Sequence, residues 1–442
     1  MPFFSNEIRP LIPLYGTMLL EGVGSGLVAS ILNVVARDDL GCSNMQVGIV
    51  WSSYNAALIL GSLVMGYFSD IVRRKYVLIV TLFWVGCGYI LTAFSASYQW
   101  FLVSRIVTGL CGGSFPIAAS ILSANLSGEF LPFGIGRLAT VSSLGFAIGP
   151  LISSAITAIW NVDSSSPFYI QRMYFFVAAG VYAVAALSAS RLRASLTAPS
   201  RTIPSDSQRS GGHDGCITKG LCLIWSSRYF STSAVTAIYV TQVYMWREYL
   251  ELNRIQISLM TMASGLVVSI GQGFGFPYLV KRIGFHQALL SGISCIAIAC
   301  VAIGPVTVYT RSVGVHVVCL VVFWLGIACM EPGTVVAVSR HLRQSKIYLE
   351  ARWPIHTGFA MGITSAMKYA ASLSIPTLAG LLYDNHRELV YYVGAAICSL
   401  GIIAVVSAWR LYESKSTPVS PNGKQEEETT NSVYDDTTVD GP

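Results

Sequence analysis

Four charged side chains lie deep within apolar stretches of the sequence: Glu21, Arg105, Glu331 and Lys368. A charge in hydrocarbon is costly, so such residues usually serve a function. A carboxyl group in a medium of low dielectric constant favours its protonated form, and an approaching guanidinium favours release of the proton. We predict that Glu21 or Glu331 carries a proton and that Arg105 controls its release, with Glu21 preferred because its partner is nearer. The alternatives are structural: Arg105 would anchor helix packing, and Lys368 would extend toward the cytoplasmic surface.

A charged stretch at residues 66–75 separates two apolar runs, each long enough to cross a bilayer. Asp70 lies three and four residues before Arg73 and Arg74, and this spacing brings the side chains within pairing reach on one helical turn. Gly66 lets the preceding helix pack closely against a neighbour, and Lys75 adds a further positive charge. The stretch predicts a tight loop at a membrane surface that acts as a conformational latch. The alternative is an ordinary positively charged loop on the cytoplasmic side of the membrane.

Aromatic and polar side chains within the apolar stretches offer surfaces for a substrate. Aromatic faces attract organic cations, and side-chain amides donate and accept hydrogen bonds. The alternative for each aromatic residue is that it faces lipid or fills a core. The side chains predicted to bind substrate are Tyr15, Asn55, Tyr239, Gln242, Trp324 and Lys368.

The composition excludes a soluble globular protein. Of the 442 residues, 53% are hydrophobic and 11% are charged, and the mean hydropathy is +0.59, whereas soluble domains contain about 25% charged residues. Apolar stretches of about 17 residues or more cross a bilayer as helices. Such stretches are predicted at residues 10–36, 45–68, 76–95, 100–124, 138–160, 168–190, 230–246, 256–280, 285–308, 313–338, 353–383 and 390–412. The sequence therefore predicts an all-α membrane protein with twelve transmembrane helices.

A polar segment divides these spans into two halves. Hydrophobicity falls between residues 191 and 221 into a run rich in Ser, Gly and Arg, which is typical of a flexible linker. The residues after 412 are rich in Ser, Thr, Pro and acidic residues and contain too few apolar groups to fold. We predict an N-terminal six-helix bundle at 1–190, a cytoplasmic linker at 191–221, a C-terminal six-helix bundle at 222–412 and a disordered cytoplasmic tail at 413–442.

A weak internal repeat relates the two halves. Residues 45–48 align with residues 255–258 and, after one inserted residue, Asp70 aligns with Lys281, which Arg282 follows. Both halves thus place a charged turn at the same depth. The repeat predicts two pseudo-symmetric bundles and a second latch at Lys281 and Arg282.

Proline and glycine recur at matched depths in the fifth and eleventh spans. The fifth contains Gly145, Gly149 and Pro150. The eleventh contains Pro376 and Gly380. A proline in a helix interior kinks the rod, while small residues allow close approach of a neighbour. The matched positions predict a pair of hinge helices, and the alternative is that Pro and Gly are simply frequent in membrane helices.

Lys and Arg are distributed unequally between alternate loops. About 20 of the 28 fall on the side that holds both termini. Because cytoplasmic loops are the positively charged ones, we predict cytoplasmic termini in the plasma membrane or an organelle membrane. The first apolar run is longer than the core of a signal peptide, so we expect it to remain as a helix. This asymmetry accounts for the net charge of +6 without a nucleic-acid partner.

No constellation typical of an enzyme is present in the sequence. It lacks the Gly-rich, Lys-containing loop that cradles ATP phosphates. The 6 histidines show no metal-ligand spacing, and the 10 cysteines show no disulfide framework. We expect no enzymatic activity, no metal and no cofactor.

Two of the motifs resemble those of the major facilitator superfamily. Residues 66–75 are similar to its signature loop between the second and third helices, with Ile71 and Arg73 in place of the usual Arg and Gly. Residues 102–113 are similar to the family's fourth helix, in which a buried Arg is followed by a glycine face. The resemblance implies a secondary transporter with two bundles that rock around a midplane site lined by the first, fourth, seventh and tenth helices.

The fifth span resembles the signature of drug/proton antiporters within that superfamily. Gly145, Gly149 and Pro150 match this signature, while Ser153 and Ser154 replace its last two glycines. The resemblance implies that the protein exchanges protons for an exported compound.

The buried charges and the resemblance together predict proton-coupled antiport that exports small organic compounds, often amphipathic or cationic. The expected partners are a small organic solute, protons and the lipid bilayer, and we expect a monomer. One alternative is symport or facilitated uptake of an organic anion or nutrient, with Arg105 and Lys368 as binding charges. Another is a transport-inactive receptor or scaffold, which the departures in the signature loop favour.

Overall fold

The protein is represented by a computed structural model, and all regular elements in its described residues are helices. The described residues are 9–126, 130–160, 172–197, 214–252, 254–346, 357–386 and 388–416. Part of the predicted linker, residues 198–213, and most of the predicted tail, from residue 417, lie outside them.

The first half of the chain forms a series of long helices joined by short turns. The helices are α1 (Ile12–Val34), α2 (Asn44–Ile71), α3 (Arg74–Ala93), α4 (Tyr98–Leu110), α5 (Ser114–Asn125), α6 (Phe130–Trp160) and α8 (Met173–Ser190). Shorter helical segments are η2 (Arg9–Leu11), η3 (Val35–Asp39) and η4 (Ala194–Thr197). Because α4 and α5 follow each other directly, they form one interrupted span.

The second half repeats this pattern. Its helices are α9 (Asp214–Glu248), α10 (Arg254–Ile270), α11 (Phe276–Ile283), α12 (Phe285–Thr310), α13 (Val313–Lys346), α14 (Thr357–Asn385) and α15 (Leu389–Ser416). The glycine-rich π-helical segment η5 (Gly271–Gly275) joins α10 to α11, and the three form one span.

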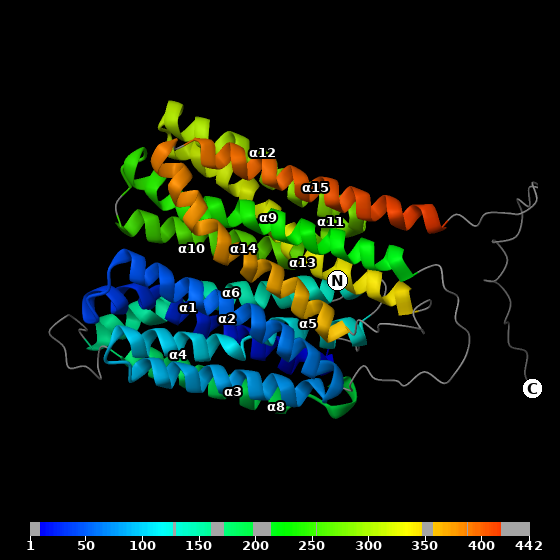
Figure 1. Ribbon diagram of the computed structural model, residues 1–442, viewed down its shortest axis with the longest axis horizontal. Coiled ribbons are helices and arrows are strands. Elements are labelled where there is room, and N and C mark those ends of the chain that lie inside the picture. The colour runs from blue at the N-terminus through cyan, green and yellow to red at the C-terminus, as the bar shows by residue number, and fades with distance from the viewer. Residues whose placement is uncertain are drawn as a thin grey trace, which may run out of the picture.

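Among the described residues, 10 spans are long and apolar enough to cross a membrane. Two further long helices, α9 and α14, run beside them through the second half (Figure 1). Their lower hydropathy reflects charged and hydroxyl side chains, among them Arg228 in α9 and Lys368 in α14. With these two there are twelve long helical units, which we call rods. The predicted fold class is therefore confirmed.

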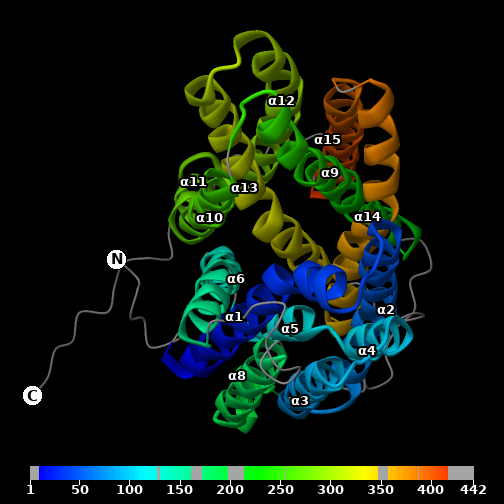
Figure 2. The same ribbon diagram turned by 90° about the vertical axis from the view of Figure 1, so that its left-hand side faces the viewer.

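The rods separate into two bundles, which Figure 2 shows one above the other. In the N-bundle, formed by α1 to α8, α1 packs against α6 and α8, and α2 packs against α4. In the C-bundle, formed by α9 to α15, α9 packs against α15 and α14, and α12 packs against α13. The bundles touch where α2 lies along α14 and α6 lies along α10 (Figure 2).

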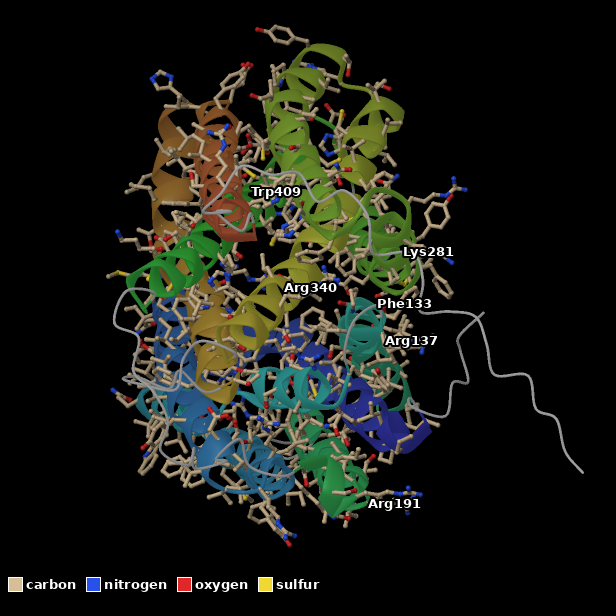
Figure 3. All side chains as sticks on the ribbon, turned by 90° about the vertical axis from the view of Figure 1, so that its right-hand side faces the viewer. Phe133, Arg137, Arg191, Lys281, Arg340 and Trp409 are labelled. Atoms are coloured by element: carbon tan, nitrogen blue, oxygen red, sulfur yellow. The ribbon has the colours of Figure 1, made fainter. Side chains whose placement is uncertain are left out.

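One end of the molecule holds the start of α1, the α2–α3 loop, the start of α14 and the end of α15, and we call it the terminal end (Figure 1). Figure 3 looks at this end and shows Arg137, Arg191, Lys281 and Arg340 there. Basic side chains thus gather at the end that we predict to be cytoplasmic.

Large apolar side chains cover the outer faces of the rods. Phe83 is 64% exposed, Leu187 66% and Ile403 61%. Side chains of this kind are costly in water and stable against lipid tails. The exposed apolar surface therefore fits a protein embedded in a bilayer.

The seventh rod begins earlier than the polar residues around Arg228 indicate. We predicted this span at residues 230–246 and counted Arg228 among the loop residues, but α9 begins at Asp214 and Arg228 lies within it. The helix continues through this charge because Arg228 pairs with a carboxylate inside the C-bundle. The fifth rod likewise begins at Phe130, before the predicted residue 138.

The fourth rod is interrupted where a continuous helix was predicted. Gly113 has φ +148°, a conformation that favours glycine, and it separates α4 from α5. A Cβ atom on Gly61 of α2 would lie 2.8 Å from the carbonyl oxygens of Leu110 and Gly112. The break therefore lets α2 approach the main chain closely, and it makes Ser114 the first residue of α5.

Helices α1 and α6 cross with their main chains in contact. Gly22 and Gly26 of α1 face Gly145 and Gly149 of α6. A Cβ atom on any of the four would collide with backbone atoms of the opposite helix. Such small-residue crossings let membrane helices gain close van der Waals contact. The crossing fixes the part of α1 that contains Glu21.

Candidate functional site

Three charged side chains meet inside the C-bundle. The Glu331 carboxylate of α13 lies 2.9 Å from Arg228 Nη2 of α9 and 3.5 Å from Lys368 Nζ of α14. The Arg228 side chain is 4% exposed, that of Glu331 20% and that of Lys368 44%. Two cations beside one carboxylate favour its ionised form. Glu331 is therefore held as an anion and is poorly suited to take up a proton.

Arg228 is a member of this cluster that the sequence analysis did not identify. It donates a hydrogen bond to Thr334 Oγ1 at 3.2 Å and lies 3.2 Å from Met330 Sδ. The signal that would have found it is the apolar run at residues 221–225, which continues the helix on the N-terminal side of Arg228.

Glu21 has an entirely different environment in the N-bundle. Ser25 Oγ and Tyr182 Oη each lie 3.4 Å from Glu21 Oε1, and they lie 2.8 Å from each other. The hydroxyl of Ser114, the first residue of α5, also lies near the Glu21 carboxyl group. Among the described residues, no basic side chain forms an ion pair with Glu21. Neutral hydroxyls can serve both the protonated and the ionised carboxyl group, so Glu21 is suited to exchange a proton.

Tyr182 owes its position at Glu21 to close packing. Its ring lies against Gly24 of α1, where a Cβ atom would come within 2.6 Å of a ring carbon. On its other side it meets the Tyr89 ring edge-on, with centroids 5.3 Å apart and an interplanar angle of 81°. Both tyrosines are almost fully buried. The phenol that donates to Glu21 is therefore held in one orientation.

Arg105 does not reach Glu21. Its guanidinium stacks over Tyr54, 4.3 Å from the ring centroid, and lies 5.6 Å from the centroid of Tyr89. Within the described part of the chain no carboxylate pairs with Arg105, which is 2% exposed. The Glu21–Arg105 contact that we expected is absent from this conformation. Arg105 instead lies over Tyr89, Tyr89 meets Tyr182 edge-on, and Tyr182 donates to Glu21.

Asp70 spans the two bundles at the terminal end. Its carboxylate accepts hydrogen bonds from the backbone N–H groups of Gly358 and Phe359, each at 2.8 Å. These are the second and third residues of α14, so a negative charge occupies the positive end of this helix. Arg74 Nη2 lies 3.7 Å from the same carboxylate, and both side chains are 1% exposed. The structure brings together the predicted charge pair and adds a partner in the other bundle.

Glycines allow this approach of α2 to α14. A Cβ atom on Gly66 would lie 2.6 Å from the Gly358 carbonyl oxygen and 3.2 Å from Gly362 Cα. Lys75, by contrast, donates to the Leu192 carbonyl at 2.8 Å within the N-bundle, and Arg73 is exposed. Of the predicted latch residues, Gly66 and Asp70 therefore contact the C-bundle, and Tyr67 beside them meets the Phe359 ring edge-on.

A second contact across the bundles comes from Arg343, near the end of α13. Its guanidinium hydrogen-bonds to the carbonyl oxygens of Ser123 and Leu126 at the end of α5. A cation at the negative end of a helix is favourable. Lys281 and Arg282, which we predicted as the second latch, are exposed in this conformation, and Arg282 stacks on Tyr278 of its own helix at 5.4 Å.

A third contact joins α6 to the end of α10 and to the π-helical segment η5. Ser143 Oγ donates to Gln272 Oε1 at 2.9 Å, and Thr140 Oγ1 donates to the Ser269 carbonyl at 3.2 Å. A Cβ atom on Gly136 would lie 2.7 Å from the Gln272 carbonyl oxygen. Together with Asp70 and Arg343, these contacts hold the bundles closed toward the terminal end.

The side chains predicted to bind substrate are divided between the two bundles. Tyr15 Oη donates to the Gly134 carbonyl at 3.4 Å, and Asn55 Nδ2 donates to the Trp51 carbonyl within its own helix at 2.9 Å. Lys368 belongs to the Glu331 cluster.

The other three predicted residues lie in the C-bundle. Tyr239 meets Phe323 edge-on with centroids 6.0 Å apart. Trp324 and Gln242 are almost fully buried. The described residues contain no group of three or more His, Cys, Asp or Glu side chains that could hold a metal ion.

The predicted hinge residues have unequal surroundings. Pro150 lies inside α6 and Pro376 inside α14. Gly145 and Gly149 form the crossing with α1, whereas a Cβ atom on Gly380 would have no neighbour within 4 Å. Close packing thus explains the glycines of the fifth span, while nothing in the structure requires glycine at position 380.

We expect Gly149→Ala to lower the thermal stability of the purified protein by several degrees. The added methyl group would meet the Leu27 backbone nitrogen and must push α1 away from α6, and overpacking of this kind costs about 1–3 kcal/mol. Gly380→Ala is the matched control, and its melting temperature should stay near that of the wild type. Equal melting temperatures for the two variants would show that the crossing is not tight.

Most of the chain is similar to known proteins. Residues 14–348 match the family model described as Major Facilitator Superfamily. The chain is 26% identical over 157 residues to the class B tetracycline resistance protein of Escherichia coli, a match that covers 35% of this chain and 38% of that protein. It is 24% identical over 161 residues to the bacillibactin exporter of Bacillus subtilis, covering 35% of this chain and 40% of that one. Both matches thus span about two fifths of the relative's length.

The fold is shared with solved structures over nearly the whole chain. The crystal structure of the human organic anion transporter MFSD10 (TETRAN) superposes with a TM-score of 0.71 at 15% identity. The superposition covers 91% of this chain and 100% of that one. At this identity the likeness concerns the arrangement of the helices.

Proposed function

This chain belongs to the Major Facilitator Superfamily, and from that premise we propose that it is a proton-coupled antiporter that exports small organic compounds. It is an integral multi-pass membrane protein, and it works as a secondary transporter by alternating access. We further propose that it acts as a monomer with cytoplasmic termini, in the plasma membrane or an organelle membrane.

The observation that carries the proposal is the contrast between the two buried glutamates. Glu331 lies between two cations, and its charge is compensated. Glu21 has only hydroxyl partners and no ion pair among the described residues. A transporter driven by a proton gradient needs a carboxyl group that changes its protonation state. We therefore assign the proton to Glu21.

The contacts at the terminal end support alternating access. Asp70, Arg343 and the η5 segment join the bundles there through hydrogen bonds to backbone and side-chain groups. Each contact is small, so it can break and re-form while the bundles stay intact. We assign this conformation to the state that is closed toward the terminal end, in which Glu21 takes up its proton from the opposite side.

Two relatives support export rather than uptake. One is named as an exporter and the other as a resistance protein. Both are distant, and neither identifies the compound that this chain moves.

A second candidate function is transport of an organic anion, which one observation favours. Three cations, Arg105, Arg228 and Lys368, lie deep in the bundles, and only Glu331 is paired with any of them in the described residues. If Glu21 is protonated, these charges leave a net positive interior that would suit an anionic solute.

The test is flux in proteoliposomes that contain the purified protein. A compound library is first screened by the thermal shift that ligands cause, and the compounds that bind are then followed across the membrane with and without a proton gradient. Exchange of solute for protons supports antiport. Movement of solute and protons in the same direction would replace antiport by symport, and binding without flux would favour a receptor.

A further inference from the structure

We propose that the acidic segment at residues 425–442 binds to a basic surface at the terminal end of the C-bundle and favours the closed conformation from there. Three features carry the inference: the stacked side chains that build this surface, the scarcity of carboxylates around it, and the length of chain between it and the acidic segment. The binding does not depend on the proposed function, whereas its effect on opening rests on the contacts assigned above to the closed state. We call the surface the basic cap, and its members are Lys281, Arg282, Arg340 and Arg410.

Three helices of the C-bundle meet at the basic cap through stacked side chains. The Arg340 guanidinium of α13 lies over the ring of Phe285, the first residue of α12, 4.5 Å from its centroid. The next residue, His286, lies with its ring centroid 5.2 Å from that of Phe285. On its other side the His286 ring stacks on Trp409 of α15, with centroids 5.1 Å apart and an interplanar angle of 4°. The stack fixes the ends of α12, α13 and α15 against one another, and Figure 3 shows Arg340 and Trp409 at this end.

The exposed cations of the basic cap lie at the ends of this stack. Lys281 and Arg282 belong to the last turn of α11, and Gly284, with φ +84°, turns the chain from α11 into α12. Arg410 follows the stacked tryptophan directly in α15. The side chains of Lys281, Arg282 and Arg410 are all exposed, and the stacked guanidinium of Arg340 keeps its charge. Four positive charges are therefore held close together by one rigid group of helix ends.

Carboxylates are scarce at the terminal end. Among the side chains whose positions the structure describes there, Asp70 is the only carboxylate, and it is buried against Arg74 and the start of α14. In the described part of the chain, no carboxylate forms an ion pair with Lys281, Arg282 or Arg410. Clustered charges of one sign produce a potential that attracts a partner of the opposite sign. The basic cap is therefore suited to an acidic ligand.

The segment at residues 425–442 supplies such a ligand within the same chain. It contains no Lys, Arg or His. Ion pairs at a surface are individually weak, so a ligand of this kind binds through several charges at once. The acidic residues of the segment are Glu426, Glu427, Glu428, Asp435, Asp436 and Asp440.

The chain between α15 and the acidic segment has a suitable length. Helix α15 ends at Ser416, seven residues beyond Trp409, which is about 10 Å along the helix axis. Glu426 follows ten residues after Ser416, and a flexible chain of this length has an r.m.s. end-to-end distance of about 18 Å. The connection can therefore return the first glutamates to the basic cap. Such a tether also gives them an effective concentration on the order of millimolar at the cap.

The basic cap lies beside the contact between the two bundles. A Cβ atom on Gly136 of α6 would lie 3.4 Å from Pro277 Cγ of α11, so these two helices touch. Figure 3 shows Arg137 of α6 and Lys281 of α11 at the same end of the molecule. An acidic segment bound at Lys281 would attract the positive charge of Arg137 as well. It would thereby draw the bundles together and favour the closed terminal end.

Zero-length cross-linking of the purified full-length protein in nanodiscs of phosphatidylcholine tests the binding. A water-soluble carbodiimide joins a carboxylate to an ammonium group in contact with it, and trypsin, which cleaves after Lys424, releases residues 425–442 as one peptide. We expect mass spectrometry to find this peptide on Lys281. Its yield on Lys75, whose ammonium donates to a carbonyl group of the N-bundle, should be about tenfold lower because the tether favours the nearby cap. Absence of the cross-link to Lys281 would overturn the binding.

Charge variants show whether the basic cap holds the segment. Arg282→Gln combined with Arg410→Gln removes two charges of the cap and leaves Lys281 reactive, so the yield on Lys281 should fall about tenfold. Arg73→Gln combined with Arg191→Gln is the matched control, because both residues are exposed at the same end in the N-bundle. Its yield should stay near that of the wild type. An equal fall in the two double variants would show a general effect of net charge and would rule out the cap as the binding site.

Two other occupants of the basic cap are distinguished by the same cross-link. If nanodiscs that contain phosphatidylserine abolish it, an anionic lipid headgroup occupies the cap. If a mixture of isotope-labelled and unlabelled protein yields cross-links mainly between labelled and unlabelled peptides, the segment binds to a second copy of the chain. Either result would overturn binding within one chain.

Hydrogen exchange at the start of α14 tests the effect on opening. The N–H groups of Gly358 and Phe359 are bonded to Asp70 when the terminal end is closed, so their exchange rates report how often it opens. Loss of the first three negative charges of the segment should raise both rates severalfold. The variant to compare with the wild type combines Glu426→Gln, Glu427→Gln and Glu428→Gln.

Unchanged exchange in this variant would overturn the effect on opening, and the cross-link to Lys281 would then stand as binding alone. Neither measurement requires a substrate or a proton gradient. If the cross-link and the change in exchange were found but proteoliposomes showed no proton-coupled flux, the proposed antiport would fail while the binding of the acidic segment would stand.

Discussion

Replacing Asp70 with Asn is expected to reduce transport by about tenfold or more, while folding and surface expression stay intact. The carboxylate accepts two backbone hydrogen bonds from the start of α14 and lies beside Arg74. Hydrogen bonds to a charged group contribute about 1.5–3 kcal/mol each. In the proposed transport cycle they exist only when the terminal end is closed, so their loss is expected to shift the balance between the access states. Initial transport rates, normalised to surface-labelled protein, measure the effect.

Three further variants show whether the effect arises at the latch. Arg73→Gln changes an exposed charge in the same loop and should leave transport near the wild-type rate. Arg74→Ala and Arg343→Gln each remove a group of the closed terminal end, and both should reduce transport. Wild-type transport in Asp70→Asn would show that the contact with α14 does not control access.

Glu21→Gln is expected to abolish uphill transport driven by a proton gradient. The amide keeps the size of the side chain and its hydrogen bonds to Ser25 and Tyr182, but it cannot bind and release a proton. Substrate binding and downhill exchange should therefore remain measurable if Glu21 carries only the proton. Parallel measurements of gradient-driven flux and of exchange at equal pH in proteoliposomes separate the two activities.

Glu331→Gln is the matched control because it makes the same chemical change in the other bundle. It leaves Arg228 buried without its carboxylate, so we expect a fall in thermal stability together with a fall in every mode of transport. Full gradient-driven transport in both Glu21→Gln and Glu331→Gln would remove the physical basis of the antiport proposal.

The twelve rods could be predicted from the sequence because a bilayer imposes a minimum length on every apolar helix. The ends of the rods were harder to predict. Arg228 was interpreted as marking the edge of a span, since an unpaired charge cannot stay in hydrocarbon. Its partner, Glu331, lies more than 100 residues away along the chain, and this pairing is not visible in the sequence around Arg228.

The charged residues of the site could be predicted, but their partners could not. Asp70 was identified from its local spacing, whereas its binding to the start of α14 depends on how the bundles meet. Glu21 and Arg105 were expected to come into contact because the first and fourth spans belong to the same bundle. The helices are instead oriented so that Arg105 lies over Tyr89 while Glu21 accepts a hydrogen bond from Tyr182. Helix rotation follows from packing against several neighbours, which local sequence patterns do not specify.

The glycine crossing of α1 and α6 has a consequence for the freedom of the proposed proton site at Glu21. With main chain against main chain, neither helix can slide or turn past the other without a collision between backbone atoms. Glu21, next to Gly22, therefore belongs to the same rigid body as α6 and has no independent degree of freedom along the membrane normal. Any change in the distance between Glu21 and the C-bundle must come from relative motion of whole bundles or from the bending of α14. The proposed proton site is thus a fixed reference point, and any motion of the second bundle changes the distance of its charges from it.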